Sequence, residues 1–473
     1  MNTIAGDILY RRVADRIQSM IEAGTFKAGD RVPSLRSLSS KLSVSVNTVR
    51  EAYMVLESRG ILEAKPQTGF FVLPPIDLPH HPVIKQPRPT RANVREIIYE
   101  VLTDNLDPEI TSLAVAVTDP LMLPLAELER AIVHSVRYNQ EAAMRYQFDP
   151  DTEELRTQIA IRMLDSDVQV RADQLAITSG GLEAVSLALS AICKTGDTIA
   201  IESPTYFVFF RLAEAMGLNL VEIPTSPSTG MNLDVLEYVL SEHSIKAIVC
   251  TPNFSNPTGS LMPDELKERL VQMAASREVP IIEDGVYGEL YFRNTKPSAL
   301  ASFDREGNVV YCSSFSKTIA PGLRLGWVMG GRRHDTIQRL KVISSISAAA
   351  PSVQSVTSLL QTGRYDRHLR RLRRGMQANM LRLIGVVLES FPAGTRITRP
   401  GGGLSVWVEL PKEIDTLRLY TKAREENISL AVGPMFTLSR DFHQFLRLSA
   451  GQLRGDEERA LRSVGAMAHA MMI

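Results

Sequence analysis

The sequence contains few cysteines and no long apolar segment, and its formal net charge is zero. The three cysteines, Cys193, Cys250 and Cys312, lie in apolar surroundings without the spacing of a metal site, which predicts buried free thiols in a reducing compartment. No apolar run reaches the roughly 18 residues of a membrane span, and the N-terminus lacks the apolar core of a secretion signal. We therefore expect a cytoplasmic protein without a metal site.

The length of 473 residues exceeds what one hydrophobic core supports. Single cores rarely grow past about 250–300 residues, so the length predicts two to four domains. Charge is distributed unevenly along the chain, because residues 1–73 hold ten Lys and Arg against seven Asp and Glu. The resulting net charge of +3 leaves −3 for the remainder. This weak bias suggests an anionic partner for the N-terminal segment.

Three amphipathic helices are predicted in the first 60 residues. Apolar residues recur at helical spacing over 9–21, 35–42 and 46–56. Ser45 is a suitable N-cap for the third helix, and Gly60 follows its end. The side chains that we expect to face inward from this helix are Val46, Val49, Tyr53 and Leu56. Because only a short turn separates the second and third helices, the pattern predicts a helix-turn-helix whose later helix enters the major groove of DNA.

A β-hairpin is predicted directly after these helices. The runs 61–64 and 70–73 are β-prone and flank a short turn, as in the wing of a winged helix. The polar face of the third helix carries side chains suited to phosphate or base contacts, namely Ser45, Asn47, Thr48 and Arg50. A small helical subdomain with a solvated polar face is the alternative that this pattern leaves open.

Longer motifs in the same segment resemble the DNA-binding domain of the GntR family. The matching stretches are Phe26–Arg36, Ser45–Arg50 and Leu56–Gly60. The resemblance implies that double-stranded operator DNA is a partner. It implies DNA contacts from Arg36, Asn47, Thr48, Arg50 and, at the tip of the wing, Thr68 and Gly69. Val46 is apolar where some members of the family carry a basic residue, so the motif does not identify the target sequence.

Six prolines between residues 74 and 91 predict a semi-rigid, extended linker. His80 and His81 in this segment could be metal ligands, but a solvated pair is the simpler interpretation. We therefore expect a winged helix-turn-helix domain over 1–73, a linker over 74–91 and a larger domain over 92–473.

From about residue 92, short apolar runs alternate with longer amphipathic ones, which predicts an α/β domain with a mostly parallel sheet. Asn256, Asp284, Tyr287 and Lys317 each follow the end of a predicted strand. The separations of 28 residues from Asn256 to Asp284 and 33 from Asp284 to Lys317 are close to the roughly 30 residues of one βαβ unit. Since the carboxyl ends of parallel strands share one edge of a sheet, we expect these side chains to meet there.

The stretch Ser313–Arg324 places a lysine, Lys317, among small hydroxyl residues and seven residues before an arginine. Desolvation and a nearby cation would lower the pKa of the lysine, as an imine-forming amine requires. Ser314, Ser316 and Arg324 are suitable phosphate donors. The grouping predicts a lysine bound as a Schiff base to a phosphate-bearing cofactor, and an exposed loop lysine is the alternative.

Residues 110–470 resemble the fold-type I aminotransferases, which use pyridoxal 5′-phosphate (PLP). The resemblance implies a large α/β part over about 110–360 and a smaller C-terminal α+β part over 361–473. It implies that Lys317 carries PLP, that Asp284 pairs with the pyridine nitrogen, and that Tyr206 stacks on the ring. It also implies that Asn256 and Tyr287 bind the phenolic oxygen. The implied phosphate ligands are Ser179, Gly180, Gly181, Ser314, Ser316 and Arg324.

Three further features concern the ligand, the assembly and the surface. Arg447 lies in a strand-like apolar run, where the resemblance implies that it binds a substrate carboxylate and where an internal salt bridge is the alternative.

Tyr146 resembles the tyrosine that reaches the phosphate of the other subunit, which implies a homodimer with shared PLP sites. Thr152 stands where relatives usually have glycine. Five arginines over 367–374 offer either a second DNA surface or a solvated helix face.

A GntR-type domain joined through a proline-rich linker to an aminotransferase-like body is the architecture of the MocR family of transcriptional regulators. The resemblance implies a regulator that responds to PLP, or to an amino acid or amine effector, by changing how paired winged helices bind DNA. Two alternatives remain: a working aminotransferase that carries a DNA-binding domain, and a binding scaffold without a cofactor.

Overall fold

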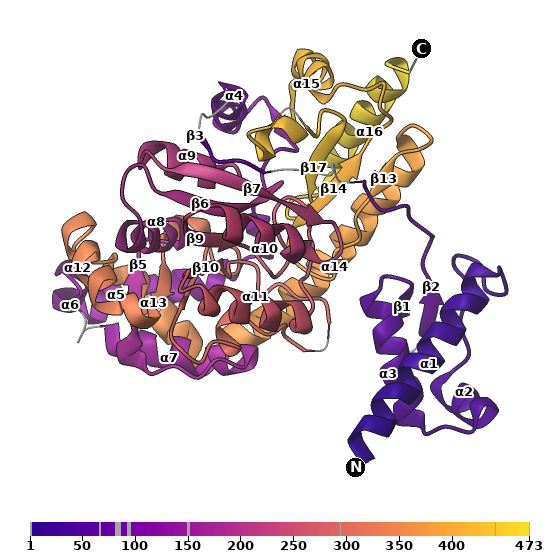
Figure 1. Ribbon diagram of the computed structural model, residues 1–473, viewed down its shortest axis with the longest axis horizontal. Coiled ribbons are helices and arrows are strands. Elements are labelled where there is room, and N and C mark those ends of the chain that lie inside the picture. The colour runs from indigo at the N-terminus through magenta and orange to yellow at the C-terminus, as the bar shows by residue number, and fades with distance from the viewer. Residues whose placement is uncertain are drawn as a thin grey trace. The chain divides into compact units, whose positions relative to one another are not determined.

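The computed structural model describes residues 2–65, 68–80, 87–91, 96–148, 152–293, 295–439 and 441–472. Contacts divide the chain into two compact units, Met1–Asp77 and Leu78–Ile473 (Figure 1). Throughout the described segments, no helix is long and apolar enough to cross a lipid bilayer.

The first unit consists of three helices and a two-stranded hairpin. They are α1 (Asn2–Glu22), α2 (Leu35–Leu42), α3 (Val46–Ser58), β1 (Leu62–Lys65) and β2 (Gly69–Val72). The side-chain oxygens of Ser34 and Ser45 cap α2 and α3 by accepting hydrogen bonds from the backbone N–H groups of Ser37 and Thr48. These caps begin each helix where the sequence predicts it. The winged helix-turn-helix is confirmed, and Pro66 and Gln67 of the wing lie outside the described residues.

Tyr53 joins three parts of this unit. Its hydroxyl donates to the Pro33 carbonyl oxygen at 2.6 Å, and its ring lies 4.9 Å from that of Phe70 in the wing. The prediction for Val46 is wrong, because this side chain is 38% exposed instead of facing inward. Val46 is the first residue of α3, and the core begins at Val49, one turn later.

The second unit is built on a nine-stranded sheet with the order β3-β7-β6-β9-β10-β11-β12-β5, to which β8 adds beside β7. The strands are β3 (Thr90–Arg91), β5 (Leu175–Thr178), β6 (Thr198–Ser203), β7 (Asn219–Ser226), β8 (Gly230–Met231), β9 (Ile245–Cys250), β10 (Ile281–Asp284), β11 (Val309–Ser314) and β12 (Gly326–Met329). Strands β7, β6, β9, β10 and β11 are parallel, as predicted. β12 is antiparallel to both neighbours, because the connection 315–325 is too short for a crossover helix.

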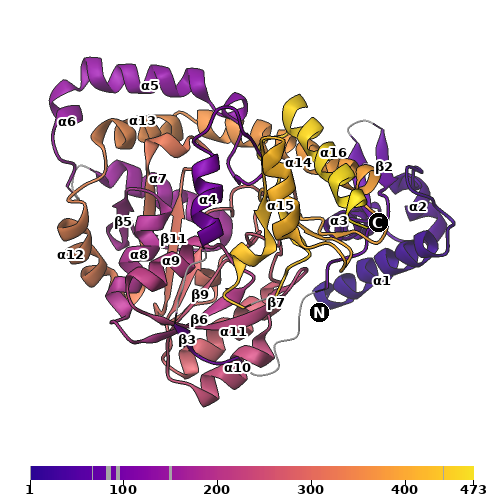
Figure 2. The same cartoon turned by 90° about the horizontal axis from the view of Figure 1, so that it is seen from above.

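Helices lie against both faces of this sheet (Figures 1 and 2). The helices between β3 and α14 are α4 (Glu96–Asp104), α5 (Leu125–Tyr138), α6 (Gln140–Met144), α7 (Glu153–Met163), α8 (Gly181–Ile192), α9 (Val208–Ala215), α10 (Leu233–Glu242), α11 (Asp264–Ser276), α12 (His334–Ser344) and α13 (Ala350–Gln361). With both faces covered, the central strands are buried along their whole length, which is why they are continuous apolar runs in the sequence.

A long helix, α14 (Arg364–Ser390), leads into a smaller α+β part. Its antiparallel sheet has the order β13-β14-β17-β16, and Trp407 at its centre stacks on Phe445 at 5.3 Å. The remaining elements are β4 (Thr111–Ser112), β13 (Arg396–Ile397), β14 (Ser405–Glu409), α15 (Thr416–Glu425), β15 (Ile428–Ser429), β16 (Ala431–Val432), β17 (Phe445–Ser449) and α16 (Gly455–Ala470). β4 and β15 form a separate two-stranded parallel sheet, through which the chain near residue 111 joins the smaller part.

The predicted free thiols are confirmed, since Cys193, Cys250 and Cys312 are all buried and unbridged. His80 donates its backbone N–H to Glu409 Oε2 at 2.7 Å, whereas His81 lies outside the described residues. Within the described part of the chain, no cluster of His, Cys, Asp or Glu side chains could hold a metal ion.

Candidate ligand-binding site and DNA-binding surface

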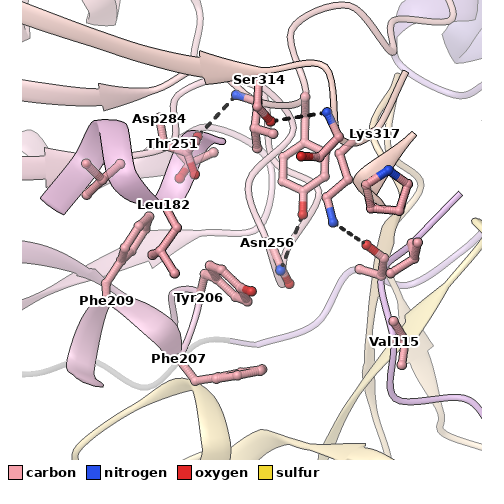
Figure 3. A pocket seen from close by; sticks show the side chains of 18 of the residues that line it. Val115, Leu182, Tyr206, Phe207, Phe209, Thr251, Asn256, Asp284, Ser314 and Lys317 are labelled. Atoms are coloured by element: carbon pink, nitrogen blue, oxygen red, sulfur yellow. Dashed lines mark hydrogen bonds between the residues drawn. The ribbon is translucent and has the colours of Figure 1, made fainter. Parts of the chain in front are cut away.

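A cavity of about 280 Å³ lies at the carboxyl ends of the parallel strands (Figure 3). Asp284 ends β10, Ser314 ends β11, and Thr251 follows β9, so three neighbouring strands deliver side chains to one place. Ten residues that the sequence predicts for the cofactor or ligand line this cavity: Gly181, Tyr206, Asn256, Asp284, Tyr287, Ser314, Ser316, Lys317, Arg324 and Arg447. Arg447 comes from β17, so both parts of the second unit build the cavity.

Lys317 lies in the loop between β11 and β12. Its Nζ donates to the Ala116 carbonyl oxygen at 2.8 Å (Figure 3). Its own carbonyl oxygen accepts from Thr118 Oγ1 at 2.6 Å. Burial, together with the nearby cations Arg447 and Arg324, lowers the pKa of Lys317 to about 8, against the opposing attraction of Asp284. An amine with a pKa near neutrality is more often unprotonated and therefore a better nucleophile.

Asp284 places a carboxylate in the cavity wall. One oxygen accepts a hydrogen bond from the Val286 backbone N–H at 3.1 Å. Burial raises the pKa of Asp284 to about 6, and nearby Lys317 opposes this shift. A partly buried carboxylate facing a cavity is suited to pair with a cationic group of a ligand, because that pairing replaces the lost hydration.

Arg447 is 2% exposed and has no carboxylate partner among the described residues. It donates to Asn256 Oδ1 at 3.3 Å and to the Ala114 carbonyl oxygen, while its Nε has no partner in the described part of the chain. Burial lowers the pKa of Arg447 to about 10. The internal salt bridge that the sequence left open is therefore absent from the described residues. A buried guanidinium without a counter-charge suits a ligand carboxylate.

Asn256 connects this arginine to the aromatic wall of the cavity. Its Nδ2 donates to Tyr287 Oη at 3.5 Å (Figure 3). Tyr206 lies after β6, with its ring 5.8 Å from that of Phe209. These aromatic residues and the Asn256 amide offer a flat apolar face beside hydrogen-bonding groups, as a planar heterocycle requires.

The turn before α8 depends on Gly180. Its φ is +100°, and a Cβ at this position would lie 2.6 Å from Arg324 Nη2. Arg324 donates through Nη2 to the Ser179 carbonyl oxygen at 3.1 Å. Glycine therefore allows a guanidinium to approach the beginning of α8. The positive end of the helix and the guanidinium together form a suitable site for a phosphate.

The role of Ser179 as a phosphate ligand stays a prediction. The Ser179 backbone N–H donates to Glu183 Oε2 at 2.5 Å, and the residue is not part of the cavity wall. Its structural contribution is the carbonyl oxygen that holds Arg324. Ser314 and Ser316, by contrast, both line the cavity, and the Ser316 N–H donates to Ser314 Oγ at 3.4 Å.

Tyr146 does not line the cavity of its own chain. Its side chain is 61% exposed, and its ring lies 6.3 Å from that of Phe148. Residues 149–151, which follow this motif, lie outside the described residues. The assignment of Tyr146 to a neighbouring subunit stays a prediction.

The sequence did not identify two groups of residues in the cavity wall. One is the segment 114–117, which contributes the carbonyl oxygens that hold Arg447 and Lys317. The other is helix α4, which contributes Val101 and Leu102, with Asn105 just after its end. The apolar run 113–117 is visible in the sequence, but it has the same pattern as a core strand. Its contacts with Arg447 and Lys317 come from backbone carbonyl oxygens, which leave no trace in the sequence.

The predicted DNA-contacting residues lie on the surface of the first unit. Arg36, Asn47 and Arg50 are exposed, and neither arginine forms an ion pair with a described residue. Arg50 Nη1 lies 3.5 Å from Asn47 Oδ1, so the two groups are neighbours on α3. Cations without an acidic partner are available to contact DNA phosphates.

The N-terminus of α3 and the wing complete this surface. Ser45 Oγ caps α3 and lies 2.8 Å from Thr48 Oγ1, while Thr68 Oγ1 donates to the Lys65 carbonyl oxygen. Gly69 has a φ of +115°, and a Cβ there would lie 2.9 Å from Arg31 Nε. The sequence did not single out Arg31, which adds a cation beside the wing.

Comparisons with known proteins agree with both units. Residues 9–72 match the bacterial regulatory proteins of the gntR family, and residues 120–464 match aminotransferase class I and II. The chain is 36% identical to YjiR of Escherichia coli over 98% of this chain and 99% of that protein. It is 34% identical to YdcR of the same organism, over 97% and 98%. Both are named as uncharacterized HTH-type transcriptional regulators. The chain belongs to the MocR family.

A solved structure supports the fold of the MocR body. LysN, an α-aminoadipate aminotransferase from Thermus thermophilus crystallised with N-(5′-phosphopyridoxyl)-L-leucine, superposes with a TM-score of 0.73 and 27% identity. The match covers 80% of this chain and 95% of LysN. PLP is the cofactor of this fold, and the cavity carries the groups that PLP requires. These are an amine of lowered pKa, a buried carboxylate, an aromatic side chain and a cluster of phosphate donors.

The environment of Lys317 predicts a pH dependence. In the protein without PLP, the rate at which a small aldehyde modifies Lys317 should be half-maximal near pH 8. Between pH 8 and the ordinary lysine pKa of about 10.4, the unfolded chain binds more protons, so the free energy of unfolding should rise with pH in this window. Arg447→Met should move the midpoint upward, because it removes a neighbouring cation.

Arg396→Met is the matched control for this measurement, since Arg396 lies on β13 beside Glu409 and outside the cavity wall. A wild-type midpoint near the ordinary lysine value, or equal midpoints in wild type and Arg447→Met, would contradict the assigned electrostatics.

Proposed function

We propose that this MocR protein is a PLP-responsive transcriptional regulator in the cytoplasm. It binds operator DNA through its first unit and binds PLP and an amino compound in the cavity of its second. The observation that carries the proposal is the meeting of Lys317, Asp284 and Arg447 around one cavity, in a chain that also has a GntR unit with exposed arginines on its surface.

Each group in the cavity has a role toward PLP that its chemistry supports. PLP, when bound, supplies a carbonyl carbon for an amine and an electron-withdrawing ring. Lys317 offers the amine, Asp284 keeps a proton at the ring nitrogen, and Tyr206 packs on the ring face. Asn256 and Tyr287 bind the phenolic oxygen. The phosphate is held by Gly180, Gly181, Ser314, Ser316 and Arg324, with Ser179 orienting Arg324.

Arg447 selects an amino compound that carries a carboxylate. Its guanidinium donates to two protein oxygens, and its Nε has no acceptor among the described residues. A ligand carboxylate therefore supplies both a counter-charge and a hydrogen-bond acceptor. Because Arg447 comes from the smaller part and Lys317 from the larger, a ligand that contacts both favours one arrangement of the two parts. A ligand regulates only if it binds the two arrangements with different affinity.

The proposal includes a homodimer in which Tyr146 contributes to the partner's phosphate site. Exposed apolar side chains lie close to Tyr146 in the chain, including Tyr138 at 74% and Met144 at 72% exposed. Apolar groups exposed together favour burial against another chain. A symmetric dimer would present two winged helices to two half-sites of an operator.

A second candidate function, transamination, is favoured by the same cavity, because the amine, the carboxylate and the ligand-binding arginine are all present. The two functions differ in turnover. A regulator binds its amino compound and changes DNA binding, whereas an aminotransferase releases a keto acid in every cycle.

Lys317→Ala should abolish the visible absorption band of lysine-bound PLP and the retention of PLP during dialysis, because the covalent attachment is lost. Lys194→Ala, which changes an exposed lysine outside the cavity wall, should retain both. Steady keto-acid production that disappears in Lys317→Ala would support transamination, and a band without turnover supports the regulator. Absence of the band from wild type would contradict both functions.

Arg36→Ala and Arg50→Ala should each weaken binding to DNA from the region upstream of the protein's own gene by about 1–3 kcal/mol. Each lost phosphate contact should also reduce the slope of log affinity against log salt by about 0.9. Arg16→Ala is the matched control, because Arg16 is an exposed arginine on α1 and is not among the residues predicted to contact DNA. Unchanged affinity and salt slope in both test variants would exclude this face as the DNA-binding surface.

A further inference from the structure

Helix α4 forms one wall of the cavity and is held from two sides. Asp104 at its end accepts hydrogen bonds from Tyr420 Oη at 2.9 Å and Ser429 Oγ at 2.7 Å, both from the smaller part. Tyr99 lies beneath the guanidinium of Arg211 on α9, 4.2 Å from the ring centroid. α4 and α15 lie side by side in Figure 2. Helix α4 is therefore anchored to both parts of the second unit.

The side chains at this wall offer no charged group to a ligand. Val101 and Leu102 of α4 are apolar. Asn105, just after the helix, is polar, but its Nδ2 donates to the Val101 carbonyl oxygen at 2.8 Å and its Oδ1 accepts from Ser112 Oγ. These two bonds orient the Asn105 amide, which is uncharged and keeps one N–H and one oxygen lone pair for a ligand.

The other walls continue this apolar surface. Val115, Val117, Leu182 and Phe207 line the cavity, and Figure 3 places Phe207 and Leu182 on the opposite side from Val115. Among the described residues of the wall, the charged groups are Asp284, Lys317, Arg324 and Arg447. In the proposed function, PLP engages Asp284, Lys317 and Arg324, and the ligand carboxylate engages Arg447. No charged group of the described wall is then left for the side chain of the ligand. A charged side chain on the ligand would therefore lose its hydration without gaining a partner.

We infer that the amino compound sensed by this protein is an α-amino acid with an uncharged, apolar side chain, and that α4 selects it through Val101 and Leu102. This inference rests on the proposed function, because it requires PLP at Lys317 and a carboxylate at Arg447. An apolar side chain of the size of leucine gains from burial against α4, whereas glutamate and lysine bring a charge that the wall does not compensate.

Calorimetric titration of the PLP-loaded, full-length protein with L-leucine, L-glutamate and L-lysine tests the inference. We expect leucine to bind at least about tenfold more tightly than either charged amino acid. Leu102→Arg should weaken leucine binding by a similar factor and strengthen glutamate binding, because it places a cation in the wall. Leu106→Arg makes the same change at a residue that is 83% exposed and outside the wall, so it should preserve the wild-type order.

The visible absorption band of bound PLP reports separately on the cavity in every variant. If wild type lacks the band, the proposed function fails before selectivity is tested. If the band is present and glutamate or lysine binds as tightly as leucine, as a charge from a second subunit would allow, the inference is overturned. Leucine binding that is unchanged in Leu102→Arg, or absent from PLP-loaded wild type, overturns it as well.

Discussion

A buried guanidinium that finds no counter-charge among the described residues is the constraint on which the second unit depends. Arg447 is held by an amide oxygen and a backbone carbonyl oxygen, neither of which neutralises it. Its charge lowers the pKa of Lys317 across the cavity, and the attraction of Asp284 does not compensate for burial and the two neighbouring cations. The protein thus maintains an excess of positive charge in a desolvated place, which an anionic ligand relieves.

Close packing of the backbone governs the phosphate end of the cavity. Gly180 and Gly326 are close enough that a Cβ on Gly326 would lie 2.7 Å from the Gly180 carbonyl carbon. This close approach brings β12, the beginning of α8 and Arg324 together. The antiparallel return of β12 after the Lys317 loop is therefore part of the site, because it places Arg324 beside the N-terminus of α8.

Much of this arrangement was predictable from the sequence, for a physical reason. Parallel strands buried on both faces are apolar runs, so the polar residues after them are easily located, and Asn256, Asp284 and Lys317 were found in this way. The carbonyl oxygens of Ala114 and Ala116 were not, because every residue has a backbone carbonyl. Leu102 of α4 was missed because an apolar residue in a cavity wall has the same sequence pattern as one in the core.

The central claim is that occupancy of the cavity is coupled to DNA binding, and it is tested most directly by one titration. The affinity and footprint of the full-length protein on DNA from its own upstream region are measured without PLP, with PLP, and with PLP and leucine. Lys317→Ala is measured in parallel. The account predicts that PLP, alone or with leucine, changes the affinity or footprint of wild type and leaves Lys317→Ala unchanged. Identical DNA binding by wild type under all three conditions would contradict it.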